Sequence, residues 1–96
     1  MPEYQDRPPP LPPLIAVDAL GVVAFLLAWM RGEDGDWMGL ITWVEQRPGA
    51  PGDPAPLILR RSRWLRAGAL ERLPGEEYDR VPRVRGVWRP YEDPEK

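Results

Sequence analysis

Residues 21–45 read GVVAFLLAWMRGEDGDWMGLITWVE and hold most of the apolar mass of the chain. Two apolar runs in this stretch are joined by the turn-forming cluster RGEDGD at residues 31–36. An Asp-Gly pair between β-branched and aromatic residues is a strong hairpin signal, because Gly35 can take the positive φ that such turns require. The stretch therefore predicts a long central β-hairpin over about residues 21–45, and the rest of the chain is interpreted around it.

Length and composition set limits on the fold and on the compartment. The chain has 96 residues, enough for one domain with a small core. It contains no cysteine and no histidine, which removes disulfides and structural zinc from consideration. We therefore expect a cytoplasmic protein without a metal or cofactor. Twelve arginines against one lysine, with no asparagine, are typical of a high-GC bacterial coding sequence.

The net charge of -2 hides an uneven distribution along the chain. Residues 1–56 carry a charge of -5, residues 57–91 carry +5, and the last five residues carry -2. This pattern predicts a charge dipole, which concerns partners more than it concerns the fold.

The first thirteen residues are rich in proline and are predicted to form a tail. Proline lacks an N–H and fixes φ, so this segment favours polyproline II over helix or central strand. The spacing of Arg7, Pro10 and Pro13 resembles the R-x-x-P-x-x-P peptides that bind SH3 domains. We expect a tail that is dispensable for folding; a peptide ligand or a strap on the surface are the alternatives.

Residues 14–30 allow two interpretations, because Asp18 is their only charge. As a helix they would span roughly 25 Å of a hydrocarbon layer about 30 Å thick, and Asp18 would cost about 2.5–3.5 kcal/mol near its centre. A signal peptide is disfavoured by the proline-rich region before the run. We prefer two strands, residues 14–20 and 21–31, with the bend at Gly21.

Alternation in the first hairpin strand predicts two apolar faces. Val23, Phe25, Leu27 and Trp29 fall on one face, and residues 22, 24, 26 and 28 fall on the other. A sheet with one wet face alternates apolar with polar residues, so a tail or another subunit is expected to cover the second face.

The rest of the chain is assigned from turn and periodicity signals. Residues 47–56 form a loop, and residues 57–59 open a third long strand that becomes basic. Residues 65–73 are predicted to form a short helical turn, with Leu65, Ala69 and Leu73 on one side, before Pro74-Gly75. Residues 78–88 are predicted to form an edge strand or arm.

This order of elements predicts an all-β fold and resembles the layout of an SH3-like small barrel over about residues 15–88. The predicted boundaries are a proline-rich tail at 1–13, one β-barrel domain at 14–89 and an acidic tail at 90–96. The predicted core consists of Val23, Phe25, Leu27, Trp29, Ile41, Trp43, Leu59, Trp64, Leu65, Leu70 and Leu73.

The inventory of reactive side chains argues against an enzyme. Ser62, Thr42 and Lys96 are the only residues of their types, and no histidine is present to act as a base. Glu33, Asp34 and Asp36 are possible ligands of a hard cation, but a hairpin turn favours Asp and Gly at these positions in any case. We predict no catalytic and no metal-binding residues.

Arginines interleaved with tryptophans form the candidate binding surface. Four arginines surround Trp64, and Arg80, Arg83, Arg85 and Arg89 surround Trp88. Arg and Trp are enriched at protein interfaces, and they also suit the phosphates and bases of single strands. We predict a non-catalytic protein interaction module, such as a small bacterial adaptor, that binds a protein partner or itself; the alternative is a single-stranded nucleic-acid-binding small barrel. The predicted partner-binding residues are Arg60, Arg61, Arg63, Trp64, Arg66, Arg83, Arg85 and Trp88.

Overall fold

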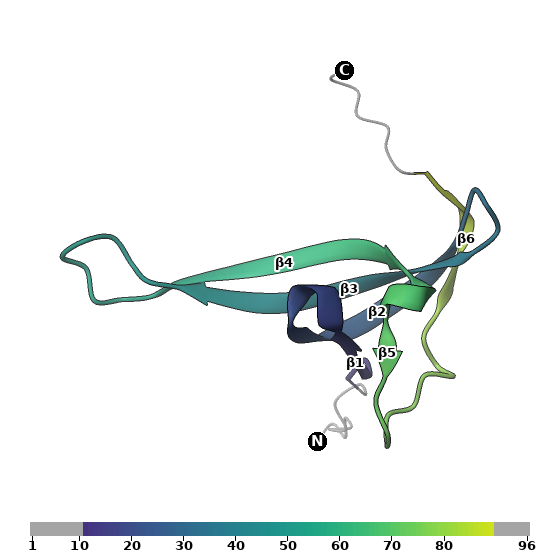
Figure 1. The fold of residues 1–96 in the computed structure, drawn as a ribbon, viewed down its shortest axis with the longest axis horizontal. Helices are drawn as coiled ribbons and strands as arrows, with labels where there is room; N and C mark the ends of the chain where they lie inside the picture. The colour runs from purple at the N-terminus through teal and green to yellow at the C-terminus, as the bar shows by residue number, and fades with distance from the viewer. Residues whose placement is uncertain (1–10, 90–96) are drawn as a thin grey trace, which may run out of the picture.

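The computed structural model describes residues 11–89 of the chain. These residues form six β-strands and two short 3-10 turns, so the all-β prediction is confirmed. Figure 1 shows one strongly bent sheet with a two-stranded arm that projects from it. The elements are β1 (Leu14–Val17), η1 (Asp18–Leu20), β2 (Val22–Gly32), β3 (Trp37–Arg47), β4 (Leu57–Arg66), η2 (Ala67–Ala69), β5 (Glu71–Arg72) and β6 (Arg83–Trp88).

The central hairpin is present where the sequence predicts it. β2 and β3 pair in antiparallel fashion, and Gly32 N–H donates to the Asp36 carbonyl oxygen at 2.7 Å to close the turn. Gly35 has φ of 92°, the left-handed conformation that a glycine adopts without steric cost. The Asp34 carboxylate accepts a hydrogen bond from Asp36 N–H at 3.1 Å. The turn is therefore specified by the residues that predicted it.

The bend before the hairpin lies at Gly21, the position that the sequence predicts. β1 ends at Val17, η1 follows, and Gly21 adopts φ of 65° with its N–H donating to the Asp18 carbonyl oxygen at 3.0 Å. This turn folds β1 back onto the start of β2, with Leu14 opposite Phe25. Asp18 lies exposed at the turn.

The predicted barrel closure is not observed. The strand order is β4-β3-β2-β1-β5, and β6 pairs with β2 beyond the end of β1. Among the described strands no ladder joins β4 to β5, although only η2 and Leu70 separate them in sequence. The sheet therefore stays open. Between β4 and β5 the chain crosses one face of the sheet, and β5 is only two residues long.

The short helical turn predicted at residues 65–73 is wrong in most of its extent. β4 continues through Trp64, Leu65 and Arg66, which pair with Leu40, Gly39 and Met38. A single 3-10 turn, η2, and the two-residue strand β5 replace the predicted helix. The ladder to β3 supplies backbone partners that outweigh the weak helical spacing of this segment.

β6 is the predicted last strand, and its partner is the first long strand. It runs parallel to β2, with Arg83 opposite Trp29 and Trp88 opposite Gly32. Gly86 has φ of 112° within the irregular part of this ladder. Pro82 precedes the strand, and its carbonyl oxygen accepts a hydrogen bond from Trp29 N–H at 2.9 Å.

A β-bulge decides which face of the sheet becomes the core. Between Leu26 and Ala28 the register with β3 shifts by one residue, which leaves Leu27 as the extra residue. Trp29 consequently lies on the same face as Leu26, not on the face of Phe25. We call this the inner face; its buried cluster is Ile15, Val17, Ala24, Leu26, Trp29, Ile41 and Val81.

The predicted core was therefore assigned partly to the wrong face. Trp29 and Ile41 are buried as predicted, whereas Val23 is 53% exposed and Phe25 only partly buried. Leu65 and Leu70 pack against the cluster from the chain that crosses the inner face, as Trp43 does from β3. Leu59 and Leu73 are partly buried and lie outside the cluster.

The second sheet face, which we call the outer face, is apolar but open. The register places four residues of β1 and β2 on the outer face: Leu14, Ala16, Val23 and Phe25. Thr42 of β3 pairs with Phe25, and Ser62 of β4 pairs with Thr42, so both lie on the same face. Val44 and Trp64 extend the same face, and Val44 is 66% exposed. No described segment covers Val23 or Val44, which stay exposed on this face.

The ends of β3 and β4 form an arm that extends past the rest of the sheet. Residues 43–47 and 57–61 pair with each other but with no other described strand, and residues 48–56 connect them (Figure 1). Leu57 and Ile58 are 50% and 58% exposed on this arm. An isolated two-stranded ribbon is only marginally stable in water.

The predicted terminal tails fall mostly outside the described residues. Arg7 and Pro10 of the proposed ligand motif and the acidic segment 90–96 belong to this undescribed part. Pro13 is described, and its carbonyl oxygen accepts a hydrogen bond from Leu26 N–H at 2.9 Å. The fold thus uses the last residue of the predicted proline-rich tail.

Candidate partner-binding surface

The first predicted Arg/Trp set lies on β4, an edge strand. Its backbone pairs with β3 on one side and with no described strand on the other. Alternation places Arg61 and Arg63 toward the inner face, and Arg60, Trp64 and Arg66 toward the outer face. Trp64 is partly buried opposite Leu40, while the four arginines are exposed.

Two of these arginines are neutralised by nearby carboxylates. Arg66 Nη1 lies 2.6 Å from Asp34 Oδ2 and 3.0 Å from Asp36 Oδ2, and Arg61 Nε lies 2.8 Å from Glu45 Oε1. The Arg66 guanidinium holds the pKa of Asp34 below its usual value, and the hydrogen bond from Arg61 does the same to the pKa of Glu45. Asp34 in turn raises the pKa of Arg66. These charges serve internal pairs and are less available to a ligand.

The second predicted set lies on β6 and divides between the two faces. Arg83 points to the inner face beside Trp29, and Trp88 lines a hollow of about 220 Å³ together with Met38, Arg66 and Asp34. Arg85 is exposed between them. Trp88 therefore approaches Arg66, which is the one place where the two predicted sets meet.

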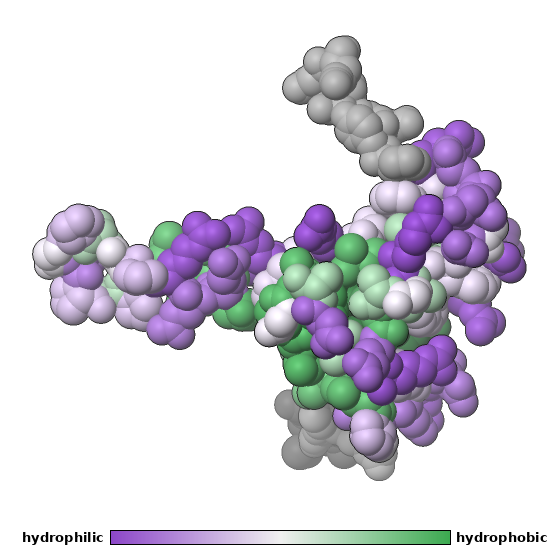
Figure 2. All heavy atoms as spheres, in the orientation of Figure 1, coloured by the Kyte–Doolittle hydropathy of each residue, from purple (hydrophilic) through white to green (hydrophobic). Residues whose placement is uncertain are grey.

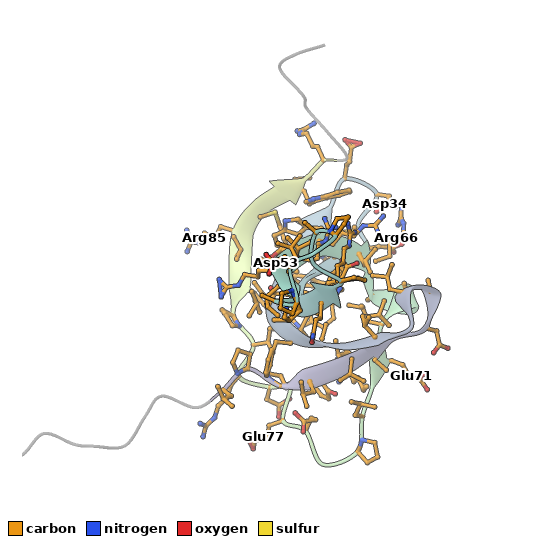
Figure 3. The ribbon with its side chains drawn as sticks, turned by 90° about the vertical axis from the view of Figure 1, so that its left-hand side faces the viewer. Asp34, Asp53, Arg66, Glu71, Glu77 and Arg85 are labelled. Carbon is orange, nitrogen blue, oxygen red and sulfur yellow. The ribbon has the colours of Figure 1, made fainter. Side chains whose placement is uncertain are left out.

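The remaining members of the two sets are far apart. Strands β3 and β2 lie between β4 and β6 in the sheet. Figure 3 shows Arg85 and Arg66 on opposite sides of the body, with Asp34 beside Arg66. The structure does not assemble the eight predicted residues into a single Arg/Trp surface.

An arginine cluster does form around a tryptophan that was not predicted as a binding residue. The Arg31 guanidinium carbon lies 4.5 Å from the centroid of the Trp37 ring, and that of Arg83 lies 5.6 Å from it. Both distances are within the range of cation–π attraction. Nearby, the guanidinium carbon of Arg72 lies 5.1 Å from the Tyr78 ring centroid.

Two hollows meet at Trp37. The first, which we call the arginine hollow, measures about 160 Å³ and is lined by Trp29, Trp37, Ala67, Arg72 and Arg83. The second, the glycine hollow, measures about 630 Å³ and shares Trp37 and Ala67 with the first. Its other lining residues are Gly35, Asp36, Arg66, Gly68 and Ala69. The two hollows therefore adjoin at Trp37 and Ala67, with Arg72 and Arg83 in the first and small residues beside the Asp36–Arg66 pair in the second.

The arginines of this cluster have no described acidic partner. Within residues 11–89 no carboxylate oxygen lies within 4.0 Å of a guanidinium nitrogen of Arg31, Arg72 or Arg83. Arg31 instead donates to the Gly35 carbonyl oxygen at 2.7 Å. Figure 2 shows hydrophilic residues gathered over the end of the molecule that carries β6 and the β2–β3 turn. The turn at this end also carries Asp34, Asp36 and Glu33, which pair with Arg66 and Arg89, whereas the arginines of the cluster lie against aromatic rings.

Sequence reasoning missed Trp37 because it treated this residue only as part of a strand. The hairpin register contained a usable signal, since Arg31 and Trp37 flank the turn symmetrically and face each other across the strands. Arg83 and Arg72 carried no comparable signal, because their approach depends on the parallel β6 ladder and on the β1–β5 pair.

The side chains considered for catalysis or metal binding are engaged with one another. The Thr42 hydroxyl donates to the Arg61 carbonyl oxygen at 2.8 Å, and the Ser62 hydroxyl donates to Thr42 Oγ1 at 3.2 Å. Asp34 and Asp36 bind Arg66. In the described part of the chain no three acidic residues are grouped as a metal site would require.

In comparisons with family models, curated proteins and solved structures, no match to the chain was found. Within residues 11–89 no helix is long and apolar enough to cross a membrane.

Proposed function

We propose that this protein is a non-catalytic interaction module that binds an acidic, extended segment of a partner protein across Trp37. The observation that carries the proposal is the arginine hollow: Arg72 and Arg83 line it with Trp37, which also stacks on Arg31, and no described carboxylate pairs with any of the three.

Carboxylate recognition follows from the chemistry of this hollow. Guanidinium groups that are close together repel each other, and an incoming carboxylate relieves that repulsion through charge-assisted, bidentate hydrogen bonds. The indole rings of Trp29 and Trp37 line the same hollow, and the nearly buried Trp29 is only 9% exposed. A partly desolvated position strengthens the attraction between a bound carboxylate and its guanidinium partners.

The dimensions favour a peptide over a nucleotide. The arginine hollow of about 160 Å³ is well below the roughly 300–1,000 Å³ that pockets for larger small molecules occupy. It suits one acidic side chain or a chain terminus. The glycine hollow continues from it along small residues, where an extended backbone can approach closely. An acidic residue followed by small or apolar residues is the partner sequence that this path fits.

The other predicted partner-binding residues have a supporting role in this proposal. Arg60, Arg63 and Arg85 are exposed and have no acidic partner within the described residues, so they add to the long-range attraction of an acidic partner. Arg61, Arg66, Trp64 and Trp88 act through packing and internal pairs. The likeness to an SH3-like layout is limited to the order of the elements along the chain, with η2 between β4 and β5, because the sheet is not closed.

Single-stranded nucleic acid is the rival ligand, and one titration series separates it from the peptide. A fluorescent acidic peptide and an oligonucleotide of equal charge are titrated with the full chain, with Arg83→Gln, and with Arg85→Gln as the matched control on the same strand. We expect peptide binding that Arg83→Gln weakens about tenfold, equal to about 1.4 kcal/mol, and that Arg85→Gln leaves within about twofold. Equal losses in both variants, or tighter binding of the oligonucleotide, would contradict the proposal.

A further inference from the structure

The outer face of the sheet is widely exposed and mainly apolar, and its charged residues on β4 are Arg60 and Arg66 near the edge. Val23 and Val44 are more than half exposed there. They line a hollow of about 490 Å³ at the point where β2 and β3 stop pairing, together with Val22, Phe25, Thr42, Trp43 and Arg60. Arg60, at the sheet edge, is the only charged residue lining that hollow. The arm carries Ile58 on the same face, opposite Gln46. An exposed apolar patch of this size marks an interaction surface.

The polar side chains in the middle of this face already have partners. Ser62 and Thr42 stand opposite each other on β4 and β3, joined by a hydrogen bond of 3.2 Å, and Thr42 also donates to a backbone carbonyl oxygen. If an apolar surface covered these two side chains, both hydroxyls would keep a hydrogen bond. Arg60 at the rim can extend its head group into water while its stem is covered.

The chain's own ends are poor candidates for covering this face. The described end of the N-terminal segment lies next to the core cluster and not over the outer face. Its residues 11–13 line a hollow together with Leu26, Val81 and Pro82. Residues 90–96 contain three acidic residues, and an acidic segment gains little from an apolar surface.

We propose that a second copy of the chain covers the outer face, the two copies packing face to face about a two-fold axis with each arm lying over the sheet of the other. The arrangement is self-complementary, as a two-fold interface requires: each copy offers an open apolar sheet and an arm whose Val44 and Ile58 need cover.

The size of the face fits a modest dimer. At about 3.3 Å per residue and about 4.8 Å between strands, the uncovered parts of β1 to β4 project to roughly 500 Å² per copy. Two copies then bury roughly 1,000 Å² in projection, which is the lower limit for a specific interface. The dimer is expected to form at micromolar concentrations.

Pairing through the edges of β4 is disfavoured by the arginines. Antiparallel pairing of β4 with its own copy, centred on Ser62, sets Arg61 opposite Arg63 on both sides of the axis. Like charges directly opposite each other destabilise a strand pair. Because Arg61 and Arg63 point to the inner face, their repulsion opposes pairing through the edge and does not oppose association through the outer face.

Sedimentation velocity over a range of concentrations tests the proposal, with Val44→Asp as the disrupting variant. Arg63→Asp is the matched control, because it introduces a carboxylate on the adjacent strand toward the inner face. We expect the wild-type chain and Arg63→Asp to approach twice the mass of 11.0 kDa, and the dissociation constant of Val44→Asp to rise at least tenfold. Circular dichroism of all three proteins confirms that the exposed substitutions leave the fold intact.

A second measurement locates the interface independently of stability. The chain has no cysteine, so Ser62→Cys and Arg63→Cys each introduce a single thiol, one near the middle of the outer face and one on the opposite side of the sheet. Disulfide-linked dimers should form much faster from Ser62→Cys. A wild-type mass of 11.0 kDa at all concentrations overturns the proposal, as does a dimer that persists in Val44→Asp; vesicle binding by a monomer would assign the face to lipid instead.

Discussion

The Tyr78 hydroxyl donates a hydrogen bond of 2.6 Å to the carbonyl oxygen of Leu14, the first residue of β1. The same oxygen atom of Tyr78 accepts a hydrogen bond of 2.8 Å from Leu73 N–H. One side chain thus fastens the start of the sheet to the segment that follows β5.

We expect Tyr78→Phe to lower the free energy of unfolding by about 1–3 kcal/mol, because two partly buried backbone groups lose their partner. The ring is retained, so its packing against the core cluster and its contact with Arg72 should persist. Urea denaturation followed by tryptophan fluorescence measures the change. A loss below about 0.5 kcal/mol would mean that water replaces the hydroxyl without cost.

Gly39 is needed where Trp29 and Leu70 lie against β3. A Cβ atom at this position would lie 2.7 Å from Leu70 Cδ1, 3.0 Å from Leu26 Cδ1 and 3.1 Å from Trp29 Cζ3. We expect Gly39→Ala to destabilise the fold by about 1–3 kcal/mol through overpacking. Gly68→Ala is the matched control, because no atom lies within 4 Å of its added carbon. Equal thermal midpoints for the two variants would refute the close-packing argument.

The bulge at Leu27 fixes which face of β2 is buried. Deleting this residue restores plain alternation and keeps Trp29 on the inner face, because Leu26, Ala28 and Trp29 already pair in order with Ile41, Leu40 and Gly39. We expect the deletion variant to keep a cooperative unfolding transition. Deletion of Ala50 in the exposed 48–56 loop serves as the control and should leave that transition in place. Loss of that transition on deletion of Leu27 would show that the extra residue itself is needed for the fold.

The ion pair between Asp34 and Arg66 predicts how stability responds to acid. The hydrogen bond that Asp34 accepts from Arg66 lowers the pKa of Asp34 below the ordinary value of 3.8. The ionised carboxylate therefore stabilises the folded state above that value, and its contribution is lost as the pH falls through the lower, folded pKa. Urea midpoints at about pH 7 and about pH 3 should differ less in Asp34→Asn than in the wild-type chain. The effect is expected to be small because the pair is exposed.

Features that depend on neighbouring residues could be predicted from the sequence. The turn at Gly35 and the bend at Gly21 follow from the conformational freedom of glycine beside short polar residues, and β4 was located by the loop before it. The bulge at Leu27 could not be predicted, since no glycine or proline marks it and both candidate faces are apolar. An error of one residue there was enough to exchange the core face with the outer face.

Features that depend on distant residues were beyond pattern reasoning. The extension of β4 through Trp64 to Arg66 results from its long ladder with β3, and the cluster at Trp37 requires β6 to lie parallel to β2. The sequence singled out arginine and tryptophan as the chemistry to examine. Which arginines meet which tryptophan is a property of the sheet topology.

The parallel pairing of β6 with β2 also has a consequence for synthesis on the ribosome. The central hairpin can form as soon as both of its strands have emerged, but the edge of β2 beside Trp29 stays open until Arg83 and the residues after it leave the exit tunnel. During that interval a nascent chain exposes an unpaired strand edge next to a nearly buried tryptophan. We therefore expect ribosome-bound chains that are halted before β6 to bind holding chaperones more strongly, and to be cleaved by protease faster, than chains halted after β6.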